Sequence, residues 1–518
     1  MAGKELQIVI TFGAILLIQV VATALGNGLF FSSHEGDMLH LADLVLRQSG
    51  GEVYHRDIAT PLGGWATLPM ALLHRAGLGL GEAMTWGQIV ASLNFFAAGL
   101  IVSVNRLTQG QSAVFALVAM GLATGLVHGG TEPLTSLAMH YNRWCWAGSL
   151  IITLAVLLPG RAPHSTVEGV AIGALMAGMA MIKLSFPVAL TIPVIFGLLR
   201  NGRIKTLLAA FGAAAAILLA VTAVEGIGYW QAYLRDILTV AGSPARAEPG
   251  EGWRSLVISP SGTPATLIVA ALIYFAARSD RRDVGAMLLL FFAAFTFVTW
   301  QNYGNDPLWL CIPALVAWVL STRGQGSAAR GLRVTAVAAG VMILPVLFNI
   351  LWSPVRHITA PEAFSRPLFP EDPTLRMVTA RGETAFAKTT VIAAPGAATA
   401  GFDGEPLGDC VLTGGLVAVM ERDSDDLLAL APGIDRQPLV ADLFQSHWIF
   451  AGLRPLPGGA PWYYDGLPGL AEATHVIIPD CPTDRRAKLR MIELLELSGL
   501  TLEPQGRTDA FRLYRIER

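Results

Sequence analysis

The sequence predicts a polytopic α-helical membrane protein with a C-terminal water-soluble α/β domain. Charged residues make up only 14% of the 518 residues, where a soluble globular protein carries about 25%. Hydrophobic residues reach 53%. The 74 charges are also uneven, because 38 of them lie in the last 166 residues. Soluble enzymes, coiled coils and disordered chains are therefore excluded, and a domain boundary is predicted between residues 352 and 353.

Eleven apolar segments are candidates for membrane-spanning helices, since about 20 mostly apolar residues are needed to cross the hydrocarbon core. They are Leu6–Leu25, Thr85–Val104, Ser112–Val127, Trp144–Leu158, Val167–Met181, Phe186–Leu199, Thr206–Val224, Pro264–Ala277, Val284–Trp300, Leu308–Leu320 and Val334–Leu351. These segments define a membrane domain of residues 1–352, and residues 26–84 form its long first outer loop. Residues 353–518 form the second domain.

Basic residues predict the topology, because short cytoplasmic loops collect Lys and Arg. With the N-terminus in the cytoplasm, every second loop is basic: Lys4, Arg106, Arg161, Arg200, Arg203, Lys205, Arg278, Arg281, Arg282, Arg323, Arg330 and Arg333. An odd number of spans then places residues 353–518 in the periplasm or outside the cell. The 31 Arg against 5 Lys indicate a GC-rich bacterial genome, hence a bacterial inner membrane. A cleaved signal peptide is an alternative reading of the first span.

The first outer loop contains the candidate catalytic carboxylates. Residues 33–37 read Ser-His-Glu-Gly-Asp, and apolar residues then recur at helical spacing from Met38 to Leu46. This pattern predicts a short amphipathic helix lying in the membrane interface. A polar turn at residues 50–57 and a second apolar helix from about Trp65 to Leu73 follow. Carboxylates at a membrane surface suggest function, but capping of the helix explains Glu35 and Asp37 as well.

This loop resembles that of the GT-C membrane glycosyltransferases, the superfamily of protein O-mannosyltransferases and aminoarabinose transferases. The family loop typically reads Asp-Glu-Gly, a helix with Leu-His-Leu-Ala, an Arg-Asp pair and a Thr-Pro-x-Gly-like turn. The corresponding stretches here are His34-Glu35-Gly36, Leu39-His40-Leu41-Ala42, Arg56-Asp57 and Thr60-Pro61-Leu62-Gly63. His34 departs from the family, which has an acidic residue there. The resemblance covers the membrane domain well and the C-terminal domain only vaguely.

The resemblance implies an enzyme that moves a sugar from a polyprenyl-phosphate donor to an acceptor at the outer face. Its partners would be membrane lipids, the lipid-linked donor and an acceptor that is a glycan, a lipid or a protein, with no cofactor. The acceptor hydroxyl must lose a proton, which calls for a positioned carboxylate. We assign this role to Glu35 first and to Asp57 second, while capping better explains Asp37, the third carboxylate of the loop.

Two basic residues are predicted to bind the departing phosphate of the donor. Lys183 lies between the fifth and sixth spans, on the predicted outer side, and a Lys followed by a hydroxyl residue and an aromatic is frequent there in the family. Its alternative role is snorkelling to lipid headgroups. Arg143 precedes Trp144 and stands near Trp146, so it fits an interfacial aromatic belt as readily as a phosphate clamp.

Other polar residues of the outer loops are predicted to contact the substrates: His34, His128, His140, Tyr141, Asn302 and Tyr303. A helix-capping turn is the alternative for residues 300–307. A metal site formed by His34, Glu35, Asp37, His128 and His140 was weighed, but no ligand pair has a diagnostic spacing, so no metal is assigned. The sequence has no Walker loop, GxSxG elbow or CxxC pair, and no basic stripe that would indicate binding to nucleic acid.

Two other functions stay open at the level of the sequence. Many transporters have a similar number of spans, although they usually contain internal repeats and broken helices, and no convincing repeat is found here. An inactive scaffold with the GT-C fold is the third possibility, because His34 replaces an acidic residue.

The C-terminal domain is predicted to be mixed α/β. Strands are expected at Thr390–Ala393, Leu416–Val419, Thr474–Ile478 and Phe511–Arg515, and a helix at Asp484–Leu497 with Thr483 as its N-cap and Gly499 at its end. An oxidising outer compartment favours a disulfide between Cys410 and Cys481, with two buried free thiols as the alternative.

Overall fold

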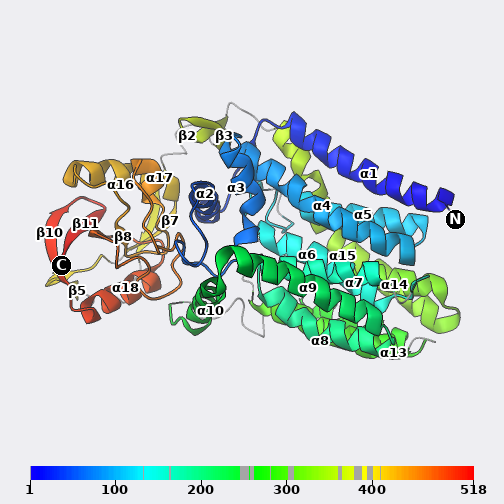
Figure 1. Ribbon diagram of the computed structural model, residues 1–518. Helices are drawn as coiled ribbons and strands as arrows, with labels where there is room; N and C mark the ends of the chain where they lie inside the picture. Colours follow the sequence, from blue (N-terminus) through cyan, green and yellow to red (C-terminus); the bar gives the residue numbers. More distant parts are fainter. Residues whose placement is uncertain are drawn as a thin grey trace. The chain divides into compact units, whose positions relative to one another are not determined.

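The computed structural model describes residues 2–131, 134–162, 165–245, 256, 262–279, 282–301, 308–359, 364–378, 388–393, 401–408 and 410–518. The chain forms two compact units (Figure 1). The first contains Met1–Asn27, Met84–Gly226 and Glu248–Ala360, and the second contains Gly28–Ala83, Ile227–Ala247 and Pro361–Arg518. Most of the loop that the sequence attached to the membrane domain thus folds together with the C-terminal segment.

The first unit is a bundle of helices, and every predicted membrane segment overlaps one of them. In chain order they are α1 (Ala2–Leu25), α4 (Leu80–Arg106), α5 (Gln109–Thr124), α6 (His140–Leu157), α7 (Thr166–Ala180), α8 (Ser185–Arg200), α9 (Ile204–Glu225), α12 (Gly262–Ala277), α13 (Arg282–Gln301), α14 (Cys311–Arg323, after the 3₁₀ turn η2, Leu308–Leu310) and α15 (Gly326–Ile358). Among the described residues, α1, α4, α9, α13 and α15 are long and apolar enough to cross a membrane. The number of eleven spans stays a prediction, because the other helices are shorter or less apolar.

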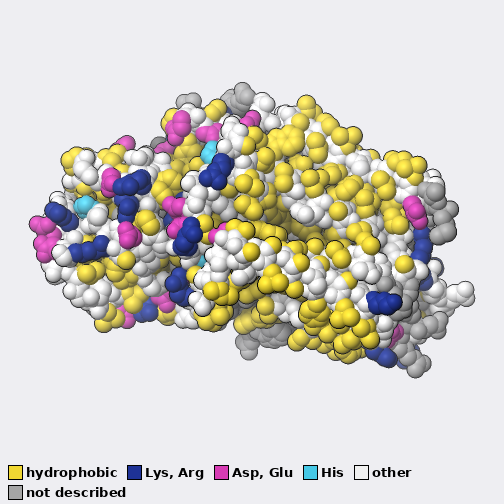
Figure 2. Space-filling view, viewed as in Figure 1, with side chains coloured by type: hydrophobic (Ala, Val, Ile, Leu, Met, Phe, Trp, Pro, Cys, Tyr) yellow, Lys and Arg dark blue, Asp and Glu magenta, His cyan; other side chains and the backbone are white. Residues whose placement is uncertain are grey.

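Large apolar side chains cover much of the face of this bundle that Figure 2 shows. Three helices expose a row of them: Leu6, Ile10, Leu17 and Ile18 on α1; Ile204, Leu208, Phe211 and Leu219 on α9; Val334, Val337, Val341 and Leu344 on α15. Contiguous apolar surface of this extent is unfavourable in water and is normal for helices that face lipid. The protein is therefore embedded in a membrane.

Glycines allow two of these helices to pack backbone against backbone. Gly169 and Gly173 stand one turn apart on α7, and α9 packs against them. A Cβ atom at Gly169 would lie 2.3 Å from the carbonyl oxygen of Thr206, and one at Gly173 would lie 2.1 Å from that of Ala210. Close approach through small residues is the usual way in which membrane helices gain packing energy, because lipid provides no hydrophobic driving force between them.

The second unit is built around a four-stranded sheet in the order β10-β11-β9-β8. Its strands are β8 (Leu439–Val440), β9 (His475–Pro479), β10 (Thr501–Arg507) and β11 (Phe511–Glu517). The β8–β9 pair is parallel and the others are antiparallel. The core against this sheet includes Met491 and Leu495 of α18 (Arg485–Leu497). The strands predicted at residues 474–478 and 511–515 are confirmed as β9 and β11.

A second sheet joins the long loop of residues 26–84 to the C-terminal segment. The strand β1 (Leu29–Phe31) lies parallel to β3 (Asp372–Val378), and β2 (Ser365–Phe369) completes the sheet on the other side of β3. Two short antiparallel pairs are β4 (Thr390–Ala393) with β7 (Cys410–Gly414), and β5 (Gly401–Phe402) with β6 (Glu405–Pro406). Smaller helical elements complete the unit: α2 (Glu35–Ser49), η1 (Gly64–Ala66), α3 (Leu68–Arg75), α10 (Ile227–Gly242), α16 (Leu416–Leu430) and α17 (His447–Ala451).

Two predictions for the C-terminal domain are wrong in detail. The predicted strand Leu416–Val419 is the first turn of α16. The buried residues from this run onward recur at helical spacing, which indicates a helix: Leu416, Val417, Met420, Asp423, Ser424 and Leu427. The N-cap of α18 is Asp484, whose side chain accepts a hydrogen bond from the backbone of Ala487, whereas Thr483 donates its hydroxyl to Asp442.

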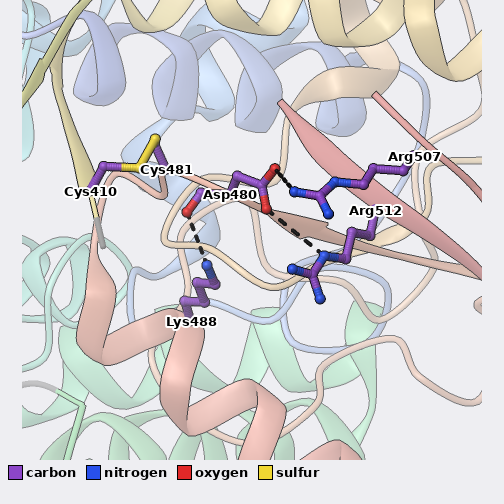
Figure 3. The surroundings of a disulfide bond; sticks show 6 residues. All are labelled: Cys410, Asp480, Cys481, Lys488, Arg507 and Arg512. Carbon is purple, nitrogen blue, oxygen red and sulfur yellow. Dashed lines mark hydrogen bonds and ion pairs between the residues drawn. A yellow bond between two sulfur atoms is a disulfide. The ribbon is translucent and has the colours of Figure 1, made fainter. Parts of the chain in front are cut away.

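The predicted disulfide is confirmed, and Cys410 of β7 is bonded to Cys481, which follows β9 (Figure 3). Asp480 lies beside it. The carboxylate of Asp480 faces the guanidinium groups of Arg507 and Arg512, at 3.3 and 3.9 Å, and its backbone carbonyl accepts from Lys488 Nζ at 3.1 Å. Burial lowers the pKa of Lys488 to about 8. These contacts tie the helix α18 to the end of β9 next to the disulfide.

Candidate functional site

Glu35, the predicted catalytic base, is the first residue of α2. His34 precedes it in a left-handed conformation with a φ of 59°, and its side chain does not cap the helix. The half-buried carboxylate of Glu35 accepts a hydrogen bond from the backbone N–H of Val417 at 3.1 Å. Val417 is in the first turn of α16, where backbone N–H groups have no intrahelical partner. Glu35 thus caps α16 and not its own helix.

Asp37 is the second carboxylate in the first turn of α2, and it is half-buried. Burial raises the pKa of Asp37 from 3.8 to about 6. Its carboxylate has no hydrogen bond or ion pair with the described part of the chain. A carboxylate of this kind accepts a proton more readily near neutral pH than an ordinary aspartate does.

The polar face of α2 begins with a close contact at its N-terminus. A Cβ atom at Gly36 would lie 2.0 Å from the ring of Phe444, so this position of the family-like motif must be glycine for steric reasons. One turn later, the ring of His40 lies 5.6 Å from that of Trp462, and Trp462 contacts Phe444 edge-to-face at 4.8 Å. Burial lowers the pKa of His40 to about 4, so its imidazole is neutral at pH 7.

The same face continues with Asp43 and Arg47, and residues 444–462 cover it too. The buried carboxylate of Asp43 accepts from Trp448 Nε1 at 2.7 Å. Burial raises the pKa of Asp43 to about 6, although the charge of Arg47 opposes the shift. Arg47 donates to the carbonyl oxygens of Leu456 and Gly459, at 3.0 and 3.4 Å. The predicted amphipathic helix is therefore present, but its polar face is covered by the C-terminal segment and does not face water.

Asp57 lies in the polar turn after α2. Its carboxylate accepts from the backbone N–H of Val53 at 2.8 Å and from Arg56 at 3.1 Å. Burial alone would raise the pKa of Asp57, but these hydrogen bonds and the charges of Arg56 and Arg47 hold it below its ordinary value. Asp57 is therefore ionised and well stabilised, which makes it a weak proton acceptor.

His55, in the same turn, is part of a buried cluster that no sequence motif predicts. Its backbone has a left-handed φ of 69°, which a non-glycine residue adopts only when its surroundings hold it there. The ring Nδ1 lies 2.9 Å from the carboxylate of Asp236 in α10. The imidazole also stacks on Tyr233 at 4.2 Å and contacts Tyr229 edge-to-face at 5.1 Å. Because its partners lie about 180 residues further on, no local motif indicates the cluster.

In the first unit, Lys183 lies between α7 and α8 and is half-buried, as is Tyr141 in the first turn of α6. Lys183 Nζ donates to Asn142 Oδ1 at 3.1 Å and lies 5.1 Å from the centre of the Tyr141 ring. A lysine has no acceptor, so this bond requires the oxygen of Asn142 to face Lys183 and turns its NH₂ group elsewhere. That NH₂ group is buried and has no partner in the described part of the chain.

Arg143 follows Asn142 and is completely buried. Its Nη1 donates to the carbonyl oxygen of Leu122 at 3.2 Å, while Nε and Nη2 have no hydrogen-bond partner among the described residues. Buried charges are normally paired, because an unpaired one is costly. All three unsatisfied atoms of this pair of residues are donors, so they would bind a hydrogen-bond acceptor, and an anionic acceptor would also offset the buried charge of Arg143.

The remaining predicted site residues are His140, His128, Asn302 and Tyr303. His140 begins α6, is buried and contacts Tyr141 and Trp144 edge-to-face at 5.5 and 4.8 Å. His128 is half-buried ahead of α6. Asn302 and Tyr303 lie outside the described residues. Within the part of the chain that the structure describes, no group of three or more His, Cys, Asp or Glu side chains could hold a metal ion.

The predicted residues thus fall into two groups. Glu35, Asp37 and Asp57 belong to the second unit, with His34. A second group gathers at the first turn of α6 in the first unit: Lys183, Arg143, His140 and Tyr141. Asn142 joins this second group through its contact with Lys183, although the sequence pattern of this predicted loop assigns no role to it.

No protein-family model matches the sequence, and no curated protein does. Among solved structures, the chain is similar to the crystal structure of ArnT from Cupriavidus metallidurans bound to undecaprenyl phosphate. The alignment has 10% identity and a TM-score of 0.41, and it covers 98% of this chain and 97% of that chain. At this TM-score it carries no weight for function.

Proposed function

We propose that the protein is a membrane glycosyltransferase that moves a sugar from a polyprenyl-phosphate donor to an acceptor hydroxyl. The reaction would take place at the outer face of a bacterial inner membrane, with the N-terminus in the cytoplasm. The observation that carries the proposal is the buried Arg143, whose Nε and Nη2 have no partner within the described residues. The motifs of the first outer loop support the same activity.

The donor phosphate would bind at the first turn of α6. The NH₂ group of Asn142 and two nitrogen atoms of Arg143 offer unsatisfied donors, and Lys183 adds a positive charge beside Asn142. When the sugar leaves, its bond to the phosphate oxygen breaks and the electron pair stays on that oxygen. Buried donors and charges stabilise this developing charge strongly, because little water screens them.

The proton of the acceptor would go to a carboxylate of the first outer loop. As the acceptor oxygen bonds to the anomeric carbon, its proton must be accepted for the transfer to be complete. Asp37 is the best suited of the three carboxylates, because its pKa is raised to about 6 and its carboxylate has no partner in the described chain. Glu35 is engaged by the N–H of Val417, and Asp57 is stabilised by Arg56.

Binding of polyprenyl phosphate to purified protein tests the donor site. Arg143→Met should weaken binding by roughly tenfold to a hundredfold, the range for losing a charged hydrogen bond. The variant should fold at least as well as the wild type, because replacing an unpaired buried charge by an apolar side chain of similar length removes a cost. Lys183→Met should weaken binding too, and Lys183→Arg should partly restore it. The control is Arg200→Met, an exposed arginine at the end of α8. Equal affinity in the wild type and Arg143→Met would refute the donor site.

Turnover of a labelled polyprenyl-phosphate sugar tests the base. Asp37→Asn should lower the rate by about a hundredfold to ten-thousandfold, the usual contribution of a general base. Glu35→Gln and Asp57→Asn should have smaller effects. The wild-type rate should fall as the pH drops below about 6, because Asp37 is then protonated. Near-normal turnover in all three variants would show that none of these carboxylates is the base.

A further inference from the structure

The helix α10 exposes large apolar side chains and buries a carboxylate. Ile227, Leu234 and Leu238 are 67%, 54% and 59% exposed, and Gln231 and Arg235 are exposed alongside them. The side chains that it buries are polar or carry a hydroxyl: Tyr229, Tyr233 and Asp236. A surface helix in water normally turns its apolar stripe inward and its polar face outward.

Specific contacts hold these buried side chains inward, so the orientation of α10 is fixed by the fold of the second unit. The carboxylate of Asp236 lies 2.9 Å from His55 Nδ1 and also accepts from the backbone N–H of Thr60 at 3.3 Å. Tyr233 stacks on the same imidazole ring, and Arg235 donates to the carbonyl oxygen of His55 at 3.4 Å. With these contacts in place, the opposite face of α10 has to point outward.

The position of α10 in the chain identifies what covers that face. Glu225 ends α9, one of the helices that are long and apolar enough to cross a membrane. Gly226 alone separates it from Ile227, and its φ of +79° allows the chain to turn sharply there. Consecutive Cα atoms are only about 3.8 Å apart, so α10 must begin at the membrane boundary.

We propose that α10 lies on the membrane surface and inserts Ile227, Leu234 and Leu238 among the phospholipid acyl chains. Helices with a strong apolar face and a polar opposite face bind lipid surfaces in this way. The side chain of Arg235 is 69% exposed, and its guanidinium donates to His55 and lies 3.6 Å from Asp236, so it forms the polar edge of this face. Through Asp236, the helix holds the turn of His55 and Asp57 at the level of the headgroups. The proposal does not depend on the enzymatic activity.

Fluorescent probes on single introduced cysteines test this position. Cys145 and Cys311 are buried and Cys410 is bonded to Cys481, so an added exposed cysteine can be labelled selectively. The environment-sensitive dye NBD is attached to Leu234→Cys and, separately, to Leu238→Cys in the full-length protein. Each variant is placed in phosphatidylcholine vesicles, with or without a lipid that carries a nitroxide quencher near the headgroup end of its acyl chain.

The control is Leu497→Cys, because Leu497 ends α18 in the same unit and is 74% exposed. The probes on α10 should emit at shorter wavelength than the probe at residue 497 and should be quenched by the nitroxide lipid. The probe at residue 497 should show neither effect. Water-like emission from both α10 probes would overturn the proposal. Short-wavelength emission without quenching by lipid would also overturn it, since a protein partner would then cover the face.

Discussion

Removal of the negative charge of Glu168 should destabilise the membrane bundle by several kcal/mol. The carboxylate of Glu168, in the first turn of α7, forms ion pairs with two arginines. Arg106 lies at the end of α4, and Arg203 lies just before α9. Arg106 approaches in a bidentate manner, with Nε and Nη2 at 2.8 and 2.6 Å from the two carboxylate oxygens. The three side chains are 0–3% exposed. Glu168→Gln keeps the shape and leaves two buried guanidinium groups without a counter-charge.

The expected cost is about 3–5 kcal/mol, the range for breaking a buried ion pair by removing one partner. A surface ion pair would contribute only about 0–1 kcal/mol. At about 1.4 kcal/mol for each factor of ten, the ratio of folded to unfolded protein should fall by roughly two to three and a half orders of magnitude. Additional substitution of Arg203 by Met should recover part of the loss, because it removes one of the unpaired charges.

A thiol-reactive dye measures this loss in the first unit specifically. Cys145 and Cys311 are buried in the helices, so they react with the dye only when the bundle opens. The other two cysteines form the disulfide and do not react with the dye when no reductant is present. The unfolding transition of Glu168→Gln should move to clearly lower denaturant or temperature than that of Glu225→Gln, a control at the half-exposed end of α9. If the two variants unfold together, the cluster around Glu168 does not stabilise the bundle as argued.

Three further outcomes are expected in the second unit. Replacing both Cys410 and Cys481 by Ser should cost roughly 4 kcal/mol in the chain-entropy description, because the bond closes a loop of 71 residues; denaturant titration with intact and reduced wild type checks the value. Gly36→Ala should destabilise by about 1–3 kcal/mol, since the added methyl group meets the ring of Phe444, and Phe444→Leu should relieve part of that cost. Burial lowers the pKa of His447 to about 4, so between pH 6.5 and 4 the unfolded chain binds a proton at this residue and the folded chain does not. The folded state therefore loses stability as the pH falls through that window. In thermal unfolding, His447→Gln should lose less stability between these pH values than the wild type does.

The positions of the helices in the first unit were predicted well from the sequence, because their signal is local. Each apolar segment needs only its own residues to form a helix that satisfies its backbone in lipid. The arginines are a different matter. The sequence pattern predicts that Arg106 and Arg203 lie in cytoplasmic loops, and in the structure both are buried against Glu168, 62 and 35 residues away in the chain. Charge counting along the sequence does not reveal such pairs.

In the C-terminal domain, too, a local sequence pattern is not sufficient to predict the structure. A short apolar run such as Leu416–Val419 satisfies a strand and a helix equally, and only the later buried residues of α16 favour the helix. The candidate site depends even more on distant contacts. Glu35 was read from its motif, but the N–H that it accepts belongs to Val417, 382 residues further on.

The polar groups that have no partner in the described chain are donors at the first turn of α6 and an acceptor in the first turn of α2, and this difference bears on function. At the first turn of α6 every unsatisfied atom of Asn142 and Arg143 is a donor, which suits an anion. In the first turn of α2, Asp37 has an acceptor without a partner in the described chain and a raised pKa, which suits a proton. In the proposed transfer of a sugar from a phosphate to a hydroxyl, negative charge leaves with the phosphate and a proton leaves the acceptor, so the donors of the first unit and the carboxylate of the second would serve different steps. A carrier of neutral solutes would need neither.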